Sequence, residues 1–171
     1  PAPGVPYRYG GAVRPARFPR RDAALISGWL DALALRTGLR GLCSADFIRS
    51  EAGYRLLEIN PRPGATLDIF DSDDARLFEA HVRACRGEPF ALPRAAGSVA
   101  SMIAYADSMV ERLPAFLWPE WTADHQPPGS RLATGDPVCT IFGSGPSAAA
   151  ARRDLNRNAR LLEYNWNDRQ P

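Results

Sequence analysis

The sequence contains no lysine, since each of its 21 basic residues is an arginine. A lysine ammonium group that contacts a phosphate would therefore have to come from another segment. Excess charge is also lacking, because the formal net charge is only +2 and the arginines are spread along the chain. Neither a nucleic-acid partner nor an anionic membrane partner is expected from this distribution.

Long apolar runs are missing as well. The longest, residues 23–35, is interrupted by polar side chains and is shorter than the ~20 residues that cross a bilayer. No secretory signal is visible. Cysteine is scarce, and Cys43, Cys85 and Cys139 form an odd number at wide spacing, which is typical of free thiols rather than of a disulfide framework. We therefore expect a cytoplasmic protein without a membrane partner.

The composition that remains, 45% hydrophobic and 23% charged over 171 residues, is that of a globular protein able to bury a core. The chain opens with Pro1, Ala2 and Pro3 instead of methionine, which suggests a piece of a longer polypeptide. Residues 1–20 are rich in proline, glycine and arginine and predict an extended segment.

Hydrophobic periodicity predicts an α+β fold. Residues 22–37 have apolar side chains at helical spacing and are followed by Gly38, while residues 41–48 and 54–60 are strand-like runs joined by a short polar link, which indicates a β-hairpin. Further predicted elements are a helix over 74–86, strands over 99–106, 112–118 and 137–142, and a closing helix over 147–162. We expect an antiparallel sheet with packed helices and a small β-rich C-terminal segment that ends in a helix.

Three oxygen-bearing side chains are predicted to share one face of this hairpin. If the turn is centred near Ala52, Asp46 lies opposite Glu58 and Ser44 lies opposite Asn60. Because strand side chains alternate between faces, Asp46, Glu58 and Asn60 then point to the same side. Two facing carboxylates repel each other unless a cation lies between them. Oxygen ligands of this kind suit Mg²⁺, which is usually bound by a few carboxylates and by substrate phosphates.

Arg62 follows this set and is flanked by Pro61 and Pro63. A guanidinium group presented by such a stiff segment could hold a transferring phosphoryl group or an acyl phosphate as charge develops. The alternative is a surface salt bridge.

The segment 41–68 reads GLCSADFIRSEAGYRLLEINPRPGATLD. Its strand acid Asp46, followed by Glu58, Asn60 and Arg62 at alternate positions, resembles the ATP-grasp superfamily. The Arg-Gly-Glu-Pro ending of the second helix and the stretch 129–147 are similar to the carboxylase-related branch of that superfamily.

The resemblance implies the C-terminal part of the ATP-grasp fold, with ATP and Mg²⁺ (or Mn²⁺) as cofactors. It implies that Glu58 bridges two metal ions, with Asp46 on one ion and Asn60 on the other. Arg62 would steady an acyl-phosphate intermediate. Leu57, whose side chain points to the opposite face, would help to line the adenine pocket.

By the same resemblance, residues 1–92 would form the C-terminal part of the ATP-grasp domain and residues 93–171 a small α/β segment packed on it. The implied activity is an ATP-dependent ligase that joins a small-molecule carboxylate to an amine, with a role in cofactor biosynthesis as one branch of this expectation. Members of the family have an upstream subdomain with phosphate-binding lysines and a glycine-rich loop. We therefore expect the missing N-terminal part of the same fold as a partner and no activity from this piece alone.

The alternative is a non-catalytic nucleotide-binding or structural module with the same fold. Self-association into a homo-oligomer through the C-terminal strands stays open.

His81 and Cys85, four residues apart on a predicted helix, could share a metal. They fall on its apolar stripe, however, which favours core packing. Residues 143–147 could cradle a phosphate, although a turn with a helix N-cap and a proline at the first helical position is the favoured interpretation.

Overall fold

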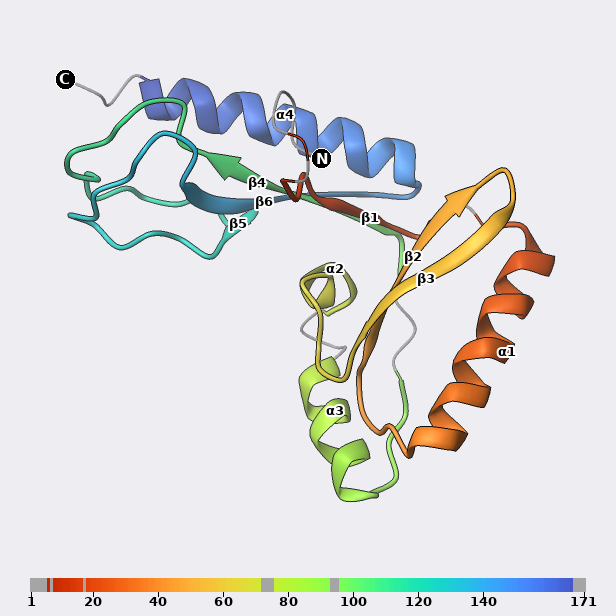
Figure 1. Ribbon diagram of the computed structural model, residues 1–171. Helices are drawn as coiled ribbons and strands as arrows, with labels where there is room; N and C mark the ends of the chain where they lie inside the picture. The colour runs from red at the N-terminus through yellow and green to blue at the C-terminus, as the bar shows by residue number, and fades with distance from the viewer. Residues whose placement is uncertain (1–5, 7, 17, 72–75, 93–95, 168–171) are drawn as a thin grey trace. The chain divides into compact units, whose positions relative to one another are not determined.

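The computed structural model describes residues 6, 8–16, 18–71, 76–92 and 96–167. Contacts divide the chain into two compact units, shown in Figure 1. We call Pro1–Ala16 with Gly97–Pro171 the sheet unit, and Arg17–Ala96 the hairpin unit. Each is described by itself.

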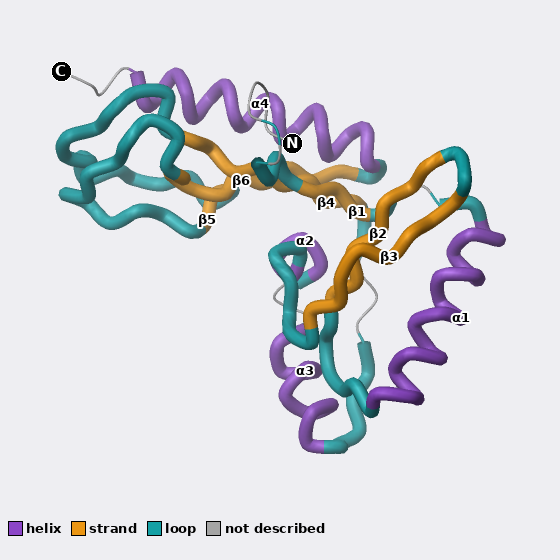
Figure 2. Tube along the Cα trace, viewed as in Figure 1, coloured by secondary structure: helices purple, strands orange, loops and turns teal. Residues whose placement is uncertain are grey.

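A four-stranded antiparallel sheet forms the centre of the sheet unit, with the strand order β1-β4-β6-β5 (Figure 2). The strands are β1 (Ala12–Arg14), β4 (Ser98–Tyr105), β5 (Thr122–Ala123) and β6 (Pro137–Gly145). The helix α4 (Ala148–Asn167) lies along one face of this sheet (Figure 1). Its four arginines between positions 152 and 160 are exposed, as the sequence predicts for the outer face of an amphipathic helix.

The sheet unit buries a well-packed core. One cluster of buried side chains joins the sheet to α4 and consists of Ala100, Cys139, Ile141, Ala151, Leu155 and Leu162. A second cluster lies under the loops around β5 and consists of Ala106, Leu113, Leu132 and Val138. Every buried side-chain nitrogen and oxygen atom among the described residues has a hydrogen-bond partner. The buried Asn158, for example, donates its Nδ2 to the carbonyl oxygen of Phe142 at 2.8 Å. These contacts give the unit a stable framework of its own.

The hairpin unit combines the antiparallel pair β2 (Ser44–Ser50) and β3 (Gly53–Asn60) with three helices. The helices are α1 (Arg20–Thr37), α2 (Leu67–Phe70) and α3 (Leu77–Arg86). Gly38 ends α1 in the left-handed conformation, with φ at 70°, and its N–H donates to the carbonyl oxygen of Ala34. Gly87 ends α3 in the same way. The glycine stops of both predicted helices are therefore confirmed.

Packing in the hairpin unit is sparse. Its buried apolar side chains among the described residues are Ile69, Leu77, Ala80 and Ala84, and α1 has no buried residue at all. The helix α1 contacts the hairpin through Trp29, which stacks on Phe47 at 6.4 Å between ring centroids, and through Asp22. Large apolar side chains stay exposed, among them Leu25, Trp29, Leu35, Ile48, Leu56, Leu57, Phe70, Phe78, Phe90 and Leu92. This unit leaves a large apolar surface uncovered.

The predicted α+β class, the hairpin and the closing helix are confirmed. The strand predicted over 112–118 is wrong, because this stretch is a loop in which Pro114 has no N–H to donate to a ladder, and Pro119 follows directly after it. Residues 1–20 are not merely an extended segment, since β1 within them pairs with β4. The helix predicted from Asp74 begins at Leu77 in the described chain, and residues 72–75 lie outside the described residues.

The compact units place residues 1–16 with the C-terminal residues, whereas the predicted domains divide the chain at residue 92. The division into domains stays a prediction.

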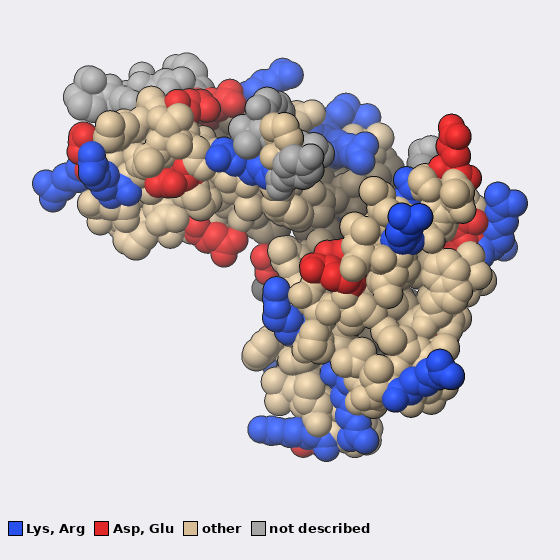
Figure 3. Space-filling model, in the orientation of Figure 1, with Lys and Arg blue, Asp and Glu red and all other residues tan. Residues whose placement is uncertain are grey.

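Basic and acidic side chains are interspersed on the face shown in Figure 3 and form no broad field of one sign there. Among the described helices, none combines the length and apolar character that a bilayer crossing requires.

Candidate functional site

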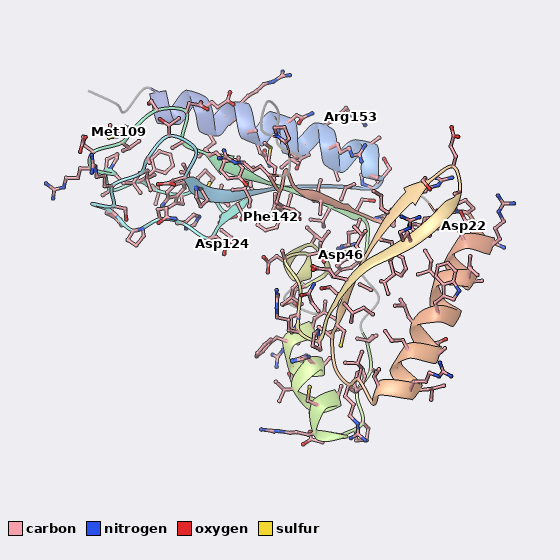
Figure 4. The ribbon with its side chains drawn as sticks, in the orientation of Figure 1. Asp22, Asp46, Met109, Asp124, Phe142 and Arg153 are labelled. Carbon is pink, nitrogen blue, oxygen red and sulfur yellow. The ribbon has the colours of Figure 1, made fainter. Side chains whose placement is uncertain are left out.

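The register of the hairpin brings the predicted ligands together. Asp46 pairs directly with Glu58, and Ser44 pairs with Asn60, as the sequence predicts. Side chains of directly opposed residues lie on the same face of an antiparallel ladder, and so do those two positions apart on one strand. A β-bulge follows between Asp46 and Phe47, so it does not disturb the register of these two pairs. Figure 4 shows the labelled Asp46 on β2.

A hydrogen bond fixes the relation between two of these side chains. Asn60 donates its Nδ2 to Oε1 of Glu58 at 2.8 Å. Because the amide uses its N–H₂ group towards Glu58, the Oδ1 oxygen of Asn60 is left to accept from, or to coordinate, another group. The second carboxylate oxygen of Glu58 stays available in the same way.

The acids at this site lack basic partners. Asp46 and Glu58 are exposed, and within the described residues no ion pair reaches either carboxylate. Their pairing across the ladder therefore places two negative charges side by side without compensation. Among the described residues no group of three or more His, Cys, Asp and Glu side chains could hold a metal ion. The predicted set has two carboxylates and an amide, a donor chemistry that fits a hard divalent cation whose remaining oxygen ligands are water or a nucleotide.

The segment after β3 turns tightly. The N–H of Arg62 donates to the carbonyl oxygen of Asn60 at 2.8 Å. The Arg62 side chain is exposed and donates its Nη1 to the carbonyl oxygen of Pro63 at 3.3 Å. No carboxylate pairs with it in the described part of the chain, which disfavours the surface salt bridge considered from the sequence.

Ser44 is an oxygen-bearing side chain that sequence reasoning paired with Asn60 but did not include among the ligands. It lies on the same face as Asp46 by strand alternation. Gly64 lies directly against it, because a Cβ added to Gly64 would be 2.9 Å from both Cβ and Oγ of Ser44. Gly64 is the feature of the sequence that could have indicated this contact, because a residue without a side chain lets the segment after β3 fold closely onto Ser44, the first residue of β2.

Leu57 lies on the opposite face of β3 from Glu58, and 61% of its surface is exposed. An exposed leucine at this position provides an apolar surface but shows no pocket around it. The adenine-lining role of Leu57 and the metal-binding roles of Asp46, Glu58 and Asn60 stay predictions, as does the role of Arg62.

Residues 143–147 are explained by helix packing. The Oγ of Ser147 accepts from the N–H of Ala150 at 3.2 Å, so Ser147 is the N-cap of α4, which begins at Ala148. Pro146 precedes this cap, so its predicted place at the first helical position is wrong. Gly143 and Gly145 belong to β6, and a Cβ on either would meet atoms of α4. The glycines are needed for this close approach.

The core packing predicted for His81 and Cys85 is wrong for the cysteine, which is exposed, and His81 is half-buried.

Among the described residues, Cys139 and Tyr54 have shifted pKa values. Burial, together with the nearby Asp124 carboxylate, raises the pKa of Cys139 to about 12. Desolvation and the hydrogen bond to Asp22 raise the pKa of Tyr54.

The fold matches solved structures of carboxylases. The chain is similar to the biotin carboxylase domain of a thermophilic 2-oxoglutarate carboxylase bound to bicarbonate, with a TM-score of 0.72, 13% identity and coverage of 91% of this chain and 40% of that chain. It is also similar to the Hydrogenobacter thermophilus domain dimer in complex with MgADP and bicarbonate, with a TM-score of 0.69, 14% identity and coverage of 88% and 38%.

A third match is N5-carboxyaminoimidazole ribonucleotide synthetase from Thermotoga maritima, with a TM-score of 0.65, 15% identity and coverage of 88% and 44%. The chain thus spans less than half of each of these three proteins. No family model and no curated protein sequence matches it. The predicted ATP-grasp fold is confirmed, because the chain has the fold of part of these proteins.

Proposed function

We propose that this chain, which has the fold of part of the ATP-grasp carboxylases, supplies the metal-nucleotide strands of an ATP-dependent ligase. The observation that carries the proposal is the Asp46–Glu58 pair, two carboxylates opposed across a ladder with Asn60 beside them and no basic partner within the described residues. In a sheet with only a structural role, this arrangement costs stability. A bound divalent cation turns the cost into a gain.

The proposed reaction is the activation of a small-molecule carboxylate by ATP, followed by displacement of phosphate from the acyl phosphate by an amine. Mg-ATP supplies the phosphoryl group and neutralises its charge in reactions of this class. Glu58 and Asp46 would hold the metal, with Glu58 shared between two ions. The hydrogen bond from its Nδ2 to Glu58 leaves the Oδ1 of Asn60 available as a further oxygen ligand.

Arg62 would bind the transferring group. Its guanidinium is exposed, is presented between Pro61 and Pro63, and has no carboxylate partner among the described residues. A free guanidinium is suited to the planar, bidentate recognition of phosphoryl and carboxylate oxygens. Leu57, on the opposite face of β3, would contribute to the adenine pocket.

A further part of the fold would complete the site. The hairpin unit leaves large apolar side chains exposed, Leu57 among them, and the chain matches under half of the three similar proteins. Because the sequence has no lysine, the phosphate-contacting lysines would come from that other part. Self-association stays a separate proposal, which size-exclusion chromatography of the chain tests.

Metal binding by the chain itself gives the direct test. Mn²⁺ is paramagnetic and broadens the NMR signals of nearby amides, so it should broaden those of β2 and β3 around Asp46 and Glu58. Glu58→Gln should abolish this broadening. The matched control is Glu51→Gln, since Glu51 is an exposed acid in the turn of the same hairpin and faces no paired carboxylate.

Glu58→Gln should also change the stability of the chain without metal, in the favourable direction. Removing one of two facing charges should raise the stability of the metal-free hairpin by roughly 0.2–1 kcal/mol, while the Glu58 Oε1 acceptor for Asn60 is preserved in glutamine. In a polypeptide that contains the rest of the fold, Glu58→Gln should remove Mg²⁺-dependent ADP formation. Unchanged Mn²⁺ broadening in the variant would overturn the assignment of Glu58, and undiminished ADP formation would overturn the proposed activity.

A further inference from the structure

Two thiols and an imidazole meet where the loop before β2 lies against α3. The Sγ of Cys43 is 4.0 Å from the carbonyl oxygen of Arg40, and the Sγ of Cys85 is 3.8 Å from the same oxygen. The two sulfur atoms are therefore no farther apart than the sum of these distances. The Sγ of Cys85 is also 3.9 Å from Nε2 of His81. Both cysteines are exposed.

The backbone fixes the orientation of the imidazole. The N–H of Leu42 donates to Nδ1 of His81 at 3.0 Å, so this nitrogen is an acceptor and the neutral ring carries its proton on Nε2. The Cys85 sulfur is nearly equidistant from the two ring nitrogens, at 4.0 Å from Nδ1 and 3.9 Å from Nε2, so the ring contacts the sulfur without directing one N–H bond at it.

Gly41 holds the loop and the helix in contact. Its φ is 81°, and a Cβ at this position would be 2.5 Å from Nδ1 of His81 and 2.8 Å from Sγ of Cys85. Only glycine allows the loop backbone to lie directly on both side chains. Cys43 is two residues further along, so its position relative to Cys85 is set by this contact.

Thiol chemistry fits this cluster better than metal binding. His81, Cys43 and Cys85 have the thiol and imidazole groups that bind soft metals, yet no group of three or more His, Cys, Asp and Glu side chains in the described residues could hold a metal ion. What the cluster does offer is two exposed thiols whose sulfur atoms both approach the carbonyl oxygen of Arg40, with an imidazole beside one of them.

We propose that Cys43 and Cys85 form an oxidisable dithiol that reacts with hydroperoxides and closes to an intrachain disulfide. The Cys85 thiolate attacks one oxygen of hydrogen peroxide and becomes a sulfenic acid, and the departing hydroxide takes up a proton to give water. The Cys43 thiolate then attacks the Cys85 sulfur, forms the S–S bond and releases a second water after proton uptake. Two thiols are oxidised and one peroxide is reduced.

The bond would tie the residue just before β2 to α3. Because β2 also carries Asp46, oxidation would restrain one strand of the proposed metal site. The thiol proposal does not depend on that site, and its test needs no ligase activity.

The test uses the whole chain, treated with hydrogen peroxide and then alkylated. Trypsin cleaves it only after arginine, since there is no lysine, so Cys43 falls in peptide 41–49, Cys85 in peptide 84–86 and Cys139 in peptide 132–152. We expect a 41–49/84–86 disulfide-linked pair that forms within one chain and disappears on reduction. Cys139 should stay reduced in the folded protein, because it is buried and its pKa is raised.

Variants assign the steps. In Cys43→Ser, Cys85 should accumulate as a sulfenic acid that dimedone traps. Cys139→Ser, which changes a buried thiol outside the cluster, should leave the rate of Cys85 oxidation unchanged. Failure of the linked pair to form in the folded chain, or its formation only between two chains, would overturn the proposal.

Discussion

Replacing Gly143 by alanine tests how closely α4 is packed on β6. A Cβ at this position would be 2.5 Å from Cα of Leu155 and 2.6 Å from the carbonyl oxygen of Ala151. Both are backbone atoms of α4, so no side chain can rotate away to make room. The methyl group can be accommodated only if the helix moves away from the strand.

The size of the effect follows from this geometry. Carbon atoms in ordinary contact are about 3.5–4.0 Å apart, so the helix would have to shift by roughly 1 Å or more. Overpacking of a core typically costs about 1–3 kcal/mol. Because the helix carries the buried Ala151, Leu155 and Leu162, the cost should be near the upper end, about 3 kcal/mol. For a unit of about 90 residues this lowers the melting temperature by more than about 10 °C.

The measurement is urea and thermal unfolding followed by circular dichroism. Gly28→Ala is the matched control, because Gly28 lies within α1 and a Cβ there meets nothing within 4 Å. The same chemical change should raise the stability of α1 by about 0.5–1 kcal/mol, since alanine is the better helix former. A Gly143→Ala chain that melts at the temperature of the unmodified chain would refute the close packing of α4 on β6.

Two further predictions concern the sheet unit. Leu113→Ala should lower the free energy of unfolding by about 2–5 kcal/mol, because this side chain is 2% exposed, whereas Leu117→Ala, at 88% exposed, should change it by less than about 0.5 kcal/mol; equal effects in urea titrations would contradict the packing. Cys139 keeps its proton in the folded state up to a pKa of about 12, while the unfolded thiol loses it near its ordinary value of 9.0. The unfolded state therefore binds fewer protons between these values, and stability should fall as the pH rises through this window. Cys139→Ala should show a shallower fall in urea midpoint between about pH 8 and pH 10, and a parallel fall in both proteins would contradict the assignment.

Local patterns predicted the hairpin well. Its strands are contiguous, and Gly53 lies where the turn requires it, with φ at 108°. Alternation along each strand then specified which residues oppose each other, so the pairing of Asp46 with Glu58 followed from the sequence. The glycine stops of the helices were readable for the same reason.

Pairing between distant segments was not readable. The strand β1 has only three residues, and its partner β4 follows more than eighty residues later, so no local signal marks it. In the stretch 112–118 the alternation suggested a strand, but the N–H of Leu113 bonds to Ser130 and the loop continues through two prolines without a ladder. Tertiary contacts decided both outcomes.

At the candidate site, too, local sequence patterns predicted some features and tertiary contacts decided the others. Sequence placed Asp46, Glu58 and Asn60 on one face, but not the amide orientation that the hydrogen bond to Glu58 imposes. Nor could spacing show that Cys43 and Cys85, far apart in the chain, approach the same carbonyl oxygen. Such convergence depends on how the loop before β2 folds back onto α3.

The pairing of β1 with β4 makes the hairpin unit an insertion in the chain of the sheet unit. Arg14 and Val99 are partners in this ladder, so the points where the backbone leaves the sheet unit and returns to it are neighbours. Excising residues 17–96 and bridging the gap with a few glycines would therefore leave every strand of the four-stranded sheet in place. Protein engineers could exchange the inserted segment as a cassette, whereas a single cut between β1 and β4 would place β1 on a different fragment from the rest of the sheet that it completes.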